Sequence, residues 1–119
     1  MCIRDRFYVD NFGATIESDG PEFLGGPRMT IINIGPDCEL NVFEIEGNTE
    51  ADKQTPMHGR GCLDHIGLLA AGLEEFSEIG ERLMADGATD GVVTIFGRKL
   101  SMFFRDPDRM ECELSLIHI

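Results

Sequence analysis

The stretch Phe104–Glu113, Phe-Arg-Asp-Pro-Asp-Arg-Met-Glu-Cys-Glu, predicts a turn between two β-strands. Proline fixes φ, and aspartate side chains form hydrogen bonds with nearby backbone groups, so Asp106-Pro107-Asp108 is typical of a tight turn. The residues before it, Arg98–Arg105, have the composition of a strand, and a further strand is expected to begin at Met110. The stretch therefore predicts a hairpin whose second strand carries an acidic residue, Glu113.

Two strands and a helix are predicted before this hairpin. Cys62–Leu69 is a short apolar run that favours a strand, and Thr89–Phe96 is a strand that can pair with Arg98–Arg105 through a tight turn at Gly97. Leu73–Asp86 is expected to be an amphipathic helix that ends at a glycine. Its apolar stripe consists of Leu73, Phe76, Ile79, Gly80 and Leu83. The order from residue 62 onward is thus strand, helix and three strands.

The first half of the chain shows the same order of elements without its opening strand, that is, a helix followed by three strands. Phe7–Gly13 is predicted to be the last turns of a helix, followed by a strand at Ala14–Ser18, a loop at Asp19–Pro27, and strands at Arg28–Ile34 and Cys38–Glu46. In the last of these strands the residues alternate between two faces. Leu40 and Val42 share one face, and Glu39, Asn41, Phe43 and Ile45 share the other.

Short sequence similarities between the halves indicate an internal repeat. The matching stretches are Gly13-Ala14-Thr15 with Gly87-Ala88-Thr89, Gly35-Pro36-Asp37 with Asp106-Pro107-Asp108, and Cys38-Glu39-Leu40 with Cys112-Glu113-Leu114. They occur in the same order and at matching places in the predicted elements. We therefore expect an α+β fold of two βαβββ modules, residues 7–46 without their first strand and residues 62–114, joined by a connecting loop at residues 47–61.

The two ends of the chain are predicted to be foreign to the natural protein. A nucleotide sequence that encodes Met1–Arg6 has a reverse complement that encodes Leu114–Ile119. Protein structure gives no reason for two ends to be encoded by complementary strands, so we interpret residues 1–6 and 114–119 as a translated sequencing adapter. Both ends are set aside from the fold prediction.

Composition excludes some classes of partner. The chain of 119 residues has the size of one domain and a formal net charge of −12. Nucleic acids and anionic membrane surfaces bind basic faces, so this charge argues against both. No apolar run approaches the roughly 20 residues that span a bilayer. Outside the N-terminal stretch, Cys38, Cys62 and Cys112 form no CxxC pair, which favours reduced, buried thiols in a cytoplasmic protein.

His65 and Glu113 are the candidate site residues. Each lies in a predicted strand, with His65 inside the run Leu63–Leu68, and both strands belong to the second module. A neutral imidazole and a carboxylate on neighbouring strands of one curved sheet can bind one divalent metal ion. The alternative for these residue types is a hydrogen-bonded core histidine and a solvated glutamate.

The two modules resemble the vicinal oxygen chelate superfamily, which includes glyoxalase-type lyases, epimerases, extradiol dioxygenases, thiol-transfer antibiotic-resistance enzymes and bleomycin-binding proteins. Leu63–Leu68 is similar to the opening strand of a unit, and Phe104–Asp108 with Glu113-Leu114 is similar to the closing motif. The resemblance covers Phe7–Glu113 and implies a cupped, incomplete barrel around one metal ion. The closing turn usually has glycine where this chain has Arg109, a difference that can strain the loop.

The resemblance implies metal ligands from the first and last strands of each unit. His65 matches the first-strand ligand of the second unit, and Glu113 matches its last-strand ligand. The first-strand ligand of the first unit would precede the first predicted helix. The remaining position falls on Asn41, because the aromatic Phe43 follows it as in the family motif, or on Glu39, which shares its strand face.

The resemblance further implies a divalent metal ion, Fe, Mn, Zn, Ni or Mg, and a small-molecule substrate. Two histidines with Glu113 as the one carboxylate would leave positions open for substrate and oxygen, as in the dioxygenases. A fourth ligand at Glu39 would favour Lewis-acid chemistry of the lyase or isomerase type. In both cases Glu113 is a metal ligand and a catalytic residue.

The alternative function is a metal-free small-molecule binding protein of the bleomycin-resistance type, which the acidic composition and Asn41 both suit. A homodimer is also implied, since members of the family often pair. His58 is an additional candidate for proton transfer at the mouth of the cup, or an exposed loop histidine. Tyr8 is expected to pack within its helix.

Overall fold

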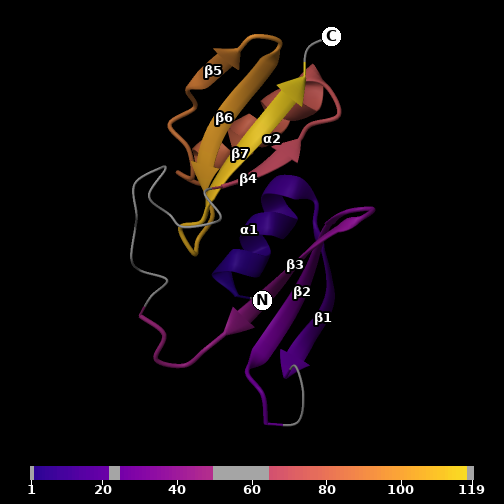
Figure 1. Ribbon diagram of the computed structural model, residues 1–119, viewed down its shortest axis with the longest axis vertical. Helices are drawn as coiled ribbons and strands as arrows, with labels where there is room; N and C mark the ends of the chain where they lie inside the picture. Colours follow the sequence, from indigo (N-terminus) through magenta and orange to yellow (C-terminus); the bar gives the residue numbers. More distant parts are fainter. Residues whose placement is uncertain (1, 22–24, 50–64, 118–119) are drawn as a thin grey trace. The chain divides into compact units, whose positions relative to one another are not determined.

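The computed structural model describes residues 2–21, 25–49 and 65–117, which form two compact units (Figure 1). Unit 1 comprises Met1–Glu50 and unit 2 comprises Ala51–Ile119. Each unit contains one helix and one sheet, so the predicted α+β class and its division into two modules of similar make-up are confirmed. The predicted connecting loop beyond residue 49, Cys62 and His58 lie outside the described residues.

Unit 2 has the predicted order of strand, helix and three strands. Its elements are β4 (Ile66–Leu69), α2 (Leu73–Ala85), β5 (Val93–Phe96), β6 (Lys99–Arg105) and β7 (Glu111–Ile117). The strand order in the sheet is β4-β7-β6-β5. β4 runs parallel to β7, and the other two pairs are antiparallel. β7 is therefore a central strand, bordered by β4 on one side and β6 on the other.

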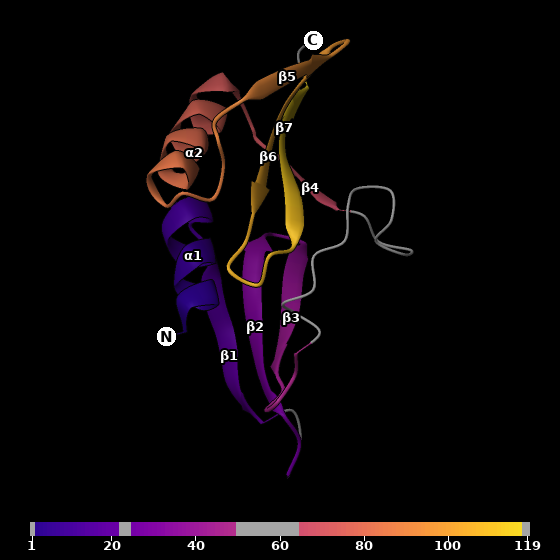
Figure 2. The same cartoon turned by 90° about the vertical axis from the view of Figure 1, so that its left-hand side faces the viewer.

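Helix α2 covers one face of this sheet, as the edge-on view in Figure 2 shows. Phe76, Ile79, Gly80 and Leu83 are buried, as the apolar stripe predicts. A Cβ at Gly80 would lie 2.9 Å from Cε of Met102, so glycine allows this close packing. Leu73 was predicted to belong to the stripe, but it is 55% exposed because it is the first residue of the helix.

Unit 1 contains α1 (Ile3–Phe12), β1 (Thr15–Pro21), β2 (Arg28–Gly35) and β3 (Cys38–Glu44), with an antiparallel sheet in the order β1-β2-β3. Gly13, with φ 67°, ends α1 as predicted, since glycine adopts the left-handed conformation without strain. Tyr8 is fully buried, and its ring packs on the edge of Phe7 at 5.3 Å between centroids. The predicted packing role of Tyr8 is therefore confirmed.

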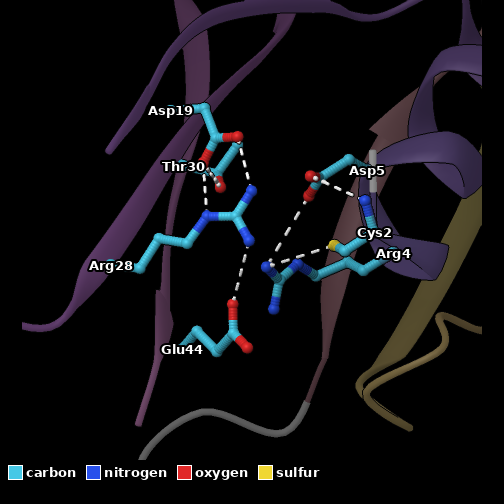
Figure 3. Close-up of polar contacts among 7 residues, drawn as sticks. All are labelled: Cys2, Arg4, Asp5, Asp19, Arg28, Thr30 and Glu44. Carbon is cyan, nitrogen blue, oxygen red and sulfur yellow. Dashed lines mark hydrogen bonds and ion pairs between the residues drawn. The ribbon is translucent and has the colours of Figure 1, made fainter. Parts of the chain in front are cut away.

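The predicted loop at Asp19–Pro27 is partly wrong, because β1 continues to Pro21. Arg28 on β2 holds Asp19 on β1 with two hydrogen bonds, Nε to Oδ1 at 2.8 Å and Nη2 to Oδ2 at 2.5 Å (Figure 3). Thr30 also donates to Asp19 at 3.1 Å, and Glu44 on β3 pairs with Arg28 at 3.3 Å. The hydrogen bonds from Arg28 lower the pKa of Asp19 and raise that of Arg28. These cross-strand bonds extend the pairing of β1 with β2 beyond the residues whose strand propensity predicts a strand.

Strand β5 is shorter than predicted and begins at Val93 instead of Thr89. Gly91 has φ 78°, which breaks the extended backbone. The Thr89 hydroxyl donates to the carbonyl of Phe103 at 2.6 Å, and Asp90 accepts from the amide of Val92 at 2.9 Å. Side chains thus satisfy backbone groups that a regular ladder would have used. β3 also ends earlier than expected, at Glu44 instead of Glu46.

The elements extend into both ends that the sequence analysis set aside. α1 begins at Ile3, and β7 continues to Ile117, with Leu114 and Leu116 buried. The alternation of leucine with serine in this tail suits a strand with one apolar face. The foreign origin of residues 1–6 and 114–119 stays a prediction.

The described cysteines do not share one environment. Cys112 is buried as predicted, but Cys38 is exposed because it begins β3 directly after a tight turn. Among the helices that the structure describes, none has the length and apolarity needed to cross a membrane.

Arg109 has a strained backbone conformation. Among the described non-glycine residues it alone has a positive φ, 66°. Its amide donates to the carbonyl of Asp106 at 2.9 Å, which closes the turn. The left-handed conformation costs an L-residue about 1–2 kcal/mol, while glycine loses more freedom on folding. We expect Arg109→Gly to raise the unfolding free energy by about 0.5–1 kcal/mol, measured by urea denaturation. Arg98→Gly removes the same charge where φ is not positive and should not stabilise; equal effects of the two variants would refute the strain at Arg109.

Candidate functional site

The candidate site lies on the face of the unit 2 sheet opposite α2, which we term the site face. Glu113 on β7 is paired with Gly67 on β4 and with Phe103 on β6. His65 immediately precedes β4, two residues before Gly67, and so shares its side of the strand. The same register places further side chains on this face: Lys99, Ser101 and Ser115. The predicted pair is therefore brought together by the parallel pairing of β4 with β7.

Glu113 is held by three donors on one of its two oxygens. Its side chain is 6% exposed, and Oε1 accepts hydrogen bonds from the hydroxyls of Ser101 and Ser115, the latter at 3.0 Å. The Lys99 Nζ lies 2.6 Å from the same oxygen. Burial by itself raises the pKa of Glu113, but the hydrogen bonds from Lys99, Ser101 and Ser115 and the charge of Lys99 outweigh it and lower the pKa to about 2. Glu113 is therefore ionised at neutral pH.

The second oxygen of Glu113 faces His65. Nε2 of His65 lies 3.3 Å from Oε2 of Glu113, and the His65 side chain is 30% exposed. The rings of Phe103 and His65 pack edge to face at 5.5 Å between centroids, with 75° between the planes. The predicted convergence of imidazole and carboxylate is thus observed, and the alternative of a solvated Glu113 does not hold.

This geometry fits two ligands of one metal ion. Nitrogen and oxygen ligands lie about 2.0–2.2 Å from Zn²⁺, so two of them at one ion are about 3 Å apart. The 3.3 Å between Nε2 and Oε2 agrees with this spacing. Within residues 2–21, 25–49 and 65–117, no group of three or more His, Cys, Asp and Glu side chains could hold a metal. His65 and Glu113 are thus compatible with part of a ligand set.

Asn41 and Glu39, the candidates for a further ligand position, lie in unit 1 on β3. Both are exposed and share one strand face, as predicted. Asn41 is paired with Ile31 and Glu39 with Asn33. The metal-binding role of Asn41 stays a prediction.

An open hollow of about 450 Å³ lies beside Phe103 in unit 2. Phe103 lines it and also contacts the ring of His65. Arg105 and Glu111 on the wall form an ion pair at 3.0 Å. The hollow is largely open to solvent, so it would cover only part of a small molecule. The other lining residues are Gly87, Ala88, Thr89, Asp90 and Phe104.

Sequence reasoning missed the three residues that hold Glu113. Period-two alternation along Lys99–Phe103 and along Glu113–Ser115 places Lys99, Ser101 and Ser115 on the site face, and this signal was available. Ser115 lies in the C-terminal stretch that the codon pattern marks as foreign, and Lys99 lies at the start of its predicted strand, away from the closing motif. Their contact with one carboxylate oxygen follows from the strand register.

Comparison with known proteins supports the fold. No protein-family model and no curated protein matches the sequence. Among solved structures, a glyoxylase/bleomycin resistance protein/dioxygenase domain from Frankia sp. EAN1pec superposes with a TM-score of 0.81 at 19% identity, over 98% of this chain and 87% of that one. A glyoxalase family protein from Enterococcus faecalis has a TM-score of 0.64 at 22% identity, over 95% and 86% of the two chains. A lactoylglutathione lyase from Agrobacterium tumefaciens has a TM-score of 0.57 at 22% identity, over 96% and 83%. The chain therefore has the glyoxalase/bleomycin resistance/dioxygenase fold, that of the vicinal oxygen chelate superfamily, as its closing hairpin motif predicted.

Proposed function

We propose that this chain is a domain of the vicinal oxygen chelate type that acts on a small molecule with a divalent metal ion. His65 and Glu113 would supply two of the metal ligands. The observation that carries the proposal is the 3.3 Å distance between Nε2 of His65 and Oε2 of Glu113. The three donors to Glu113 all contact Oε1, so Oε2 faces the imidazole. The structural relatives include a lactoylglutathione lyase and a dioxygenase-type domain, which supports the same class of chemistry.

Each residue of the site has a role that follows from its surroundings. Ser101 and Ser115 fix the Glu113 carboxylate in one orientation, so that Oε2 stays directed at His65. With a pKa of about 2, Glu113 is a weak proton acceptor at neutral pH, so its donors favour a ligand role over general-base catalysis. Phe103 packs against the imidazole and limits its rotation.

The chemistry available depends on what completes the ligand set. When bound, a divalent ion supplies Lewis-acid polarisation of a substrate oxygen. One imidazole and one carboxylate are compatible with Fe, Mn, Zn, Ni and Mg. Asn41 at the remaining position would favour a dioxygenase, and Glu39 would favour a lyase or isomerase. The hollow beside Phe103 would accept part of a small substrate. We further propose a cytoplasmic, homodimeric protein.

Metal binding by two variants tests this function. Because each variant removes one ligand atom, His65→Ala and Glu113→Gln are each expected to weaken Zn²⁺ binding at least about tenfold. Zn²⁺ affinity is measured by competition with a fluorescent chelator, and bound metal in the purified protein by mass spectrometry. Glu74→Gln, in the first turn of α2 on the other side of the sheet, removes the same charge and should bind Zn²⁺ like the wild type.

Unchanged Zn²⁺ affinity in both site variants would refute the metal centre. Small-molecule binding that persists in chelator would then favour a metal-free binding protein.

A further inference from the structure

Lys99 is the one charged donor among the side chains that hold Glu113 in the described part of unit 2. It begins β6, and its side chain extends along the site face past Ser101. Its Nζ lies 2.6 Å from Oε1 of Glu113, while 39% of the side chain remains exposed. The ammonium is therefore anchored at the carboxylate by a side chain that remains partly exposed to solvent.

The ion pair between Lys99 and Glu113 compensates the buried negative charge of Glu113 in the metal-free protein. A carboxylate that is 6% exposed is costly unless an opposite charge or hydrogen bonds compensate it. Ser101 and Ser115 supply hydrogen bonds, and Lys99 supplies the positive charge. The metal-free site is thus neutral at Glu113.

The same contact opposes a second cation. Oε1 carries the ammonium, and Oε2 is the oxygen that faces His65. A divalent ion on Oε2 would share one carboxylate with Lys99, and like charges a few ångströms apart repel. Lys99 also withdraws part of the negative charge that would attract the metal.

We propose that Lys99 is an internal counter-ion of the metal site: it stabilises Glu113 in the metal-free protein and lowers the affinity of His65 and Glu113 for a divalent cation. The inference rests on the proposed function, because it concerns the same two ligands. It makes Lys99 a positioning residue with opposite effects on two quantities, metal affinity and the stability of the metal-free protein.

Zn²⁺ binding by Lys99→Met tests the proposal, because methionine keeps an unbranched apolar side chain without the charge. We expect Zn²⁺ to bind about tenfold more tightly than to the wild type. Two matched variants separate charge from position: Lys99→Arg keeps a cation at the carboxylate, and Arg98→Met removes one charge from the adjacent position in the turn. Both should bind Zn²⁺ like the wild type. His65→Ala in the Lys99→Met background should abolish the gain.

Thermal unfolding in chelator provides the second readout. Lys99→Met should melt at a lower temperature than Arg98→Met, because it leaves the buried Glu113 carboxylate without its cation. Lower stability alone would describe any structural contact. The combination of tighter Zn²⁺ binding with lower metal-free stability is specific to an internal counter-ion.

The outcomes separate this inference from the proposed function. Tighter binding to Lys99→Met than to a wild type that binds Zn²⁺ supports both. A wild type that binds no Zn²⁺, with a Lys99→Met variant that does so through His65, supports the inference and overturns the proposed function. Equal affinities, weaker binding by Lys99→Met, or an equal gain in Arg98→Met overturn the inference. Absence of binding in both proteins overturns the two together.

Discussion

Replacing Gly67 with valine is expected to abolish Zn²⁺ binding while making the protein slightly more stable. Gly67 is paired with Glu113 and lies two residues after His65, so the space above it is bordered by both proposed ligands. A Cβ at this position meets no atom within 4 Å, and φ is not in the left-handed region. The fold therefore accepts a side chain at Gly67, and we expect the two methyl groups of valine, which reach beyond Cβ, to extend toward the imidazole and the carboxylate on either side.

The two effects of Gly67→Val have opposite signs. Glycine in a strand interior is less stable than a residue with a side chain by about 0.5–1 kcal/mol, and valine favours strands. Thermal unfolding should therefore occur at a higher temperature, while Zn²⁺ titration shows no site that depends on His65. Gly67→Ala adds one methyl group and should give an intermediate loss of affinity. Wild-type affinity in a stably folded Gly67→Val protein would place the cation elsewhere.

Replacing Leu83 with alanine is expected to destabilise unit 2 by about 2–5 kcal/mol, the range for a buried leucine. Leu83 is fully buried in the face of α2 that covers the sheet. Truncation removes apolar contacts and leaves a cavity that a close-packed interior fills only in part. Because domains are stable by only about 5–15 kcal/mol in total, this change would leave a large fraction unfolded under mild denaturing conditions.

Hydrogen exchange of the β6 and β7 amides measures this effect within unit 2. Leu73→Ala is the matched control, because it makes the same chemical change in the same helix at a side chain that is 55% exposed. We expect a loss below about 1 kcal/mol there, as for most exposed positions. Similar losses at Leu73 and Leu83 would mean that α2 does not pack through the buried stripe.

The predictions from the sequence succeeded where the signal was local. The turn at Asp106–Asp108, the helix end at Gly13 and the period of α2 each depend on residues within a few positions of one another. They failed where side chains far apart in the sequence determine the structure. Asp19 is one example, because hydrogen bonds from Arg28 and Thr30 hold it in β1. Thr89 is a second case, because its hydroxyl donates to the carbonyl of Phe103, and β5 begins only at Val93.

Local patterns in the sequence establish the two-module organisation and the closing hairpin, because alternation and turn chemistry involve residues a few positions apart. His65 and Glu113 lie far apart in the chain, and the family resemblance is what marks them as candidate ligands. The folded sheet sets which oxygen of Glu113 faces His65 and which is held by Lys99, Ser101 and Ser115. This arrangement depends on strand register. A shift of β6 by one residue against β7 would turn Lys99 and Ser101 to the side of α2, and composition alone does not set that register.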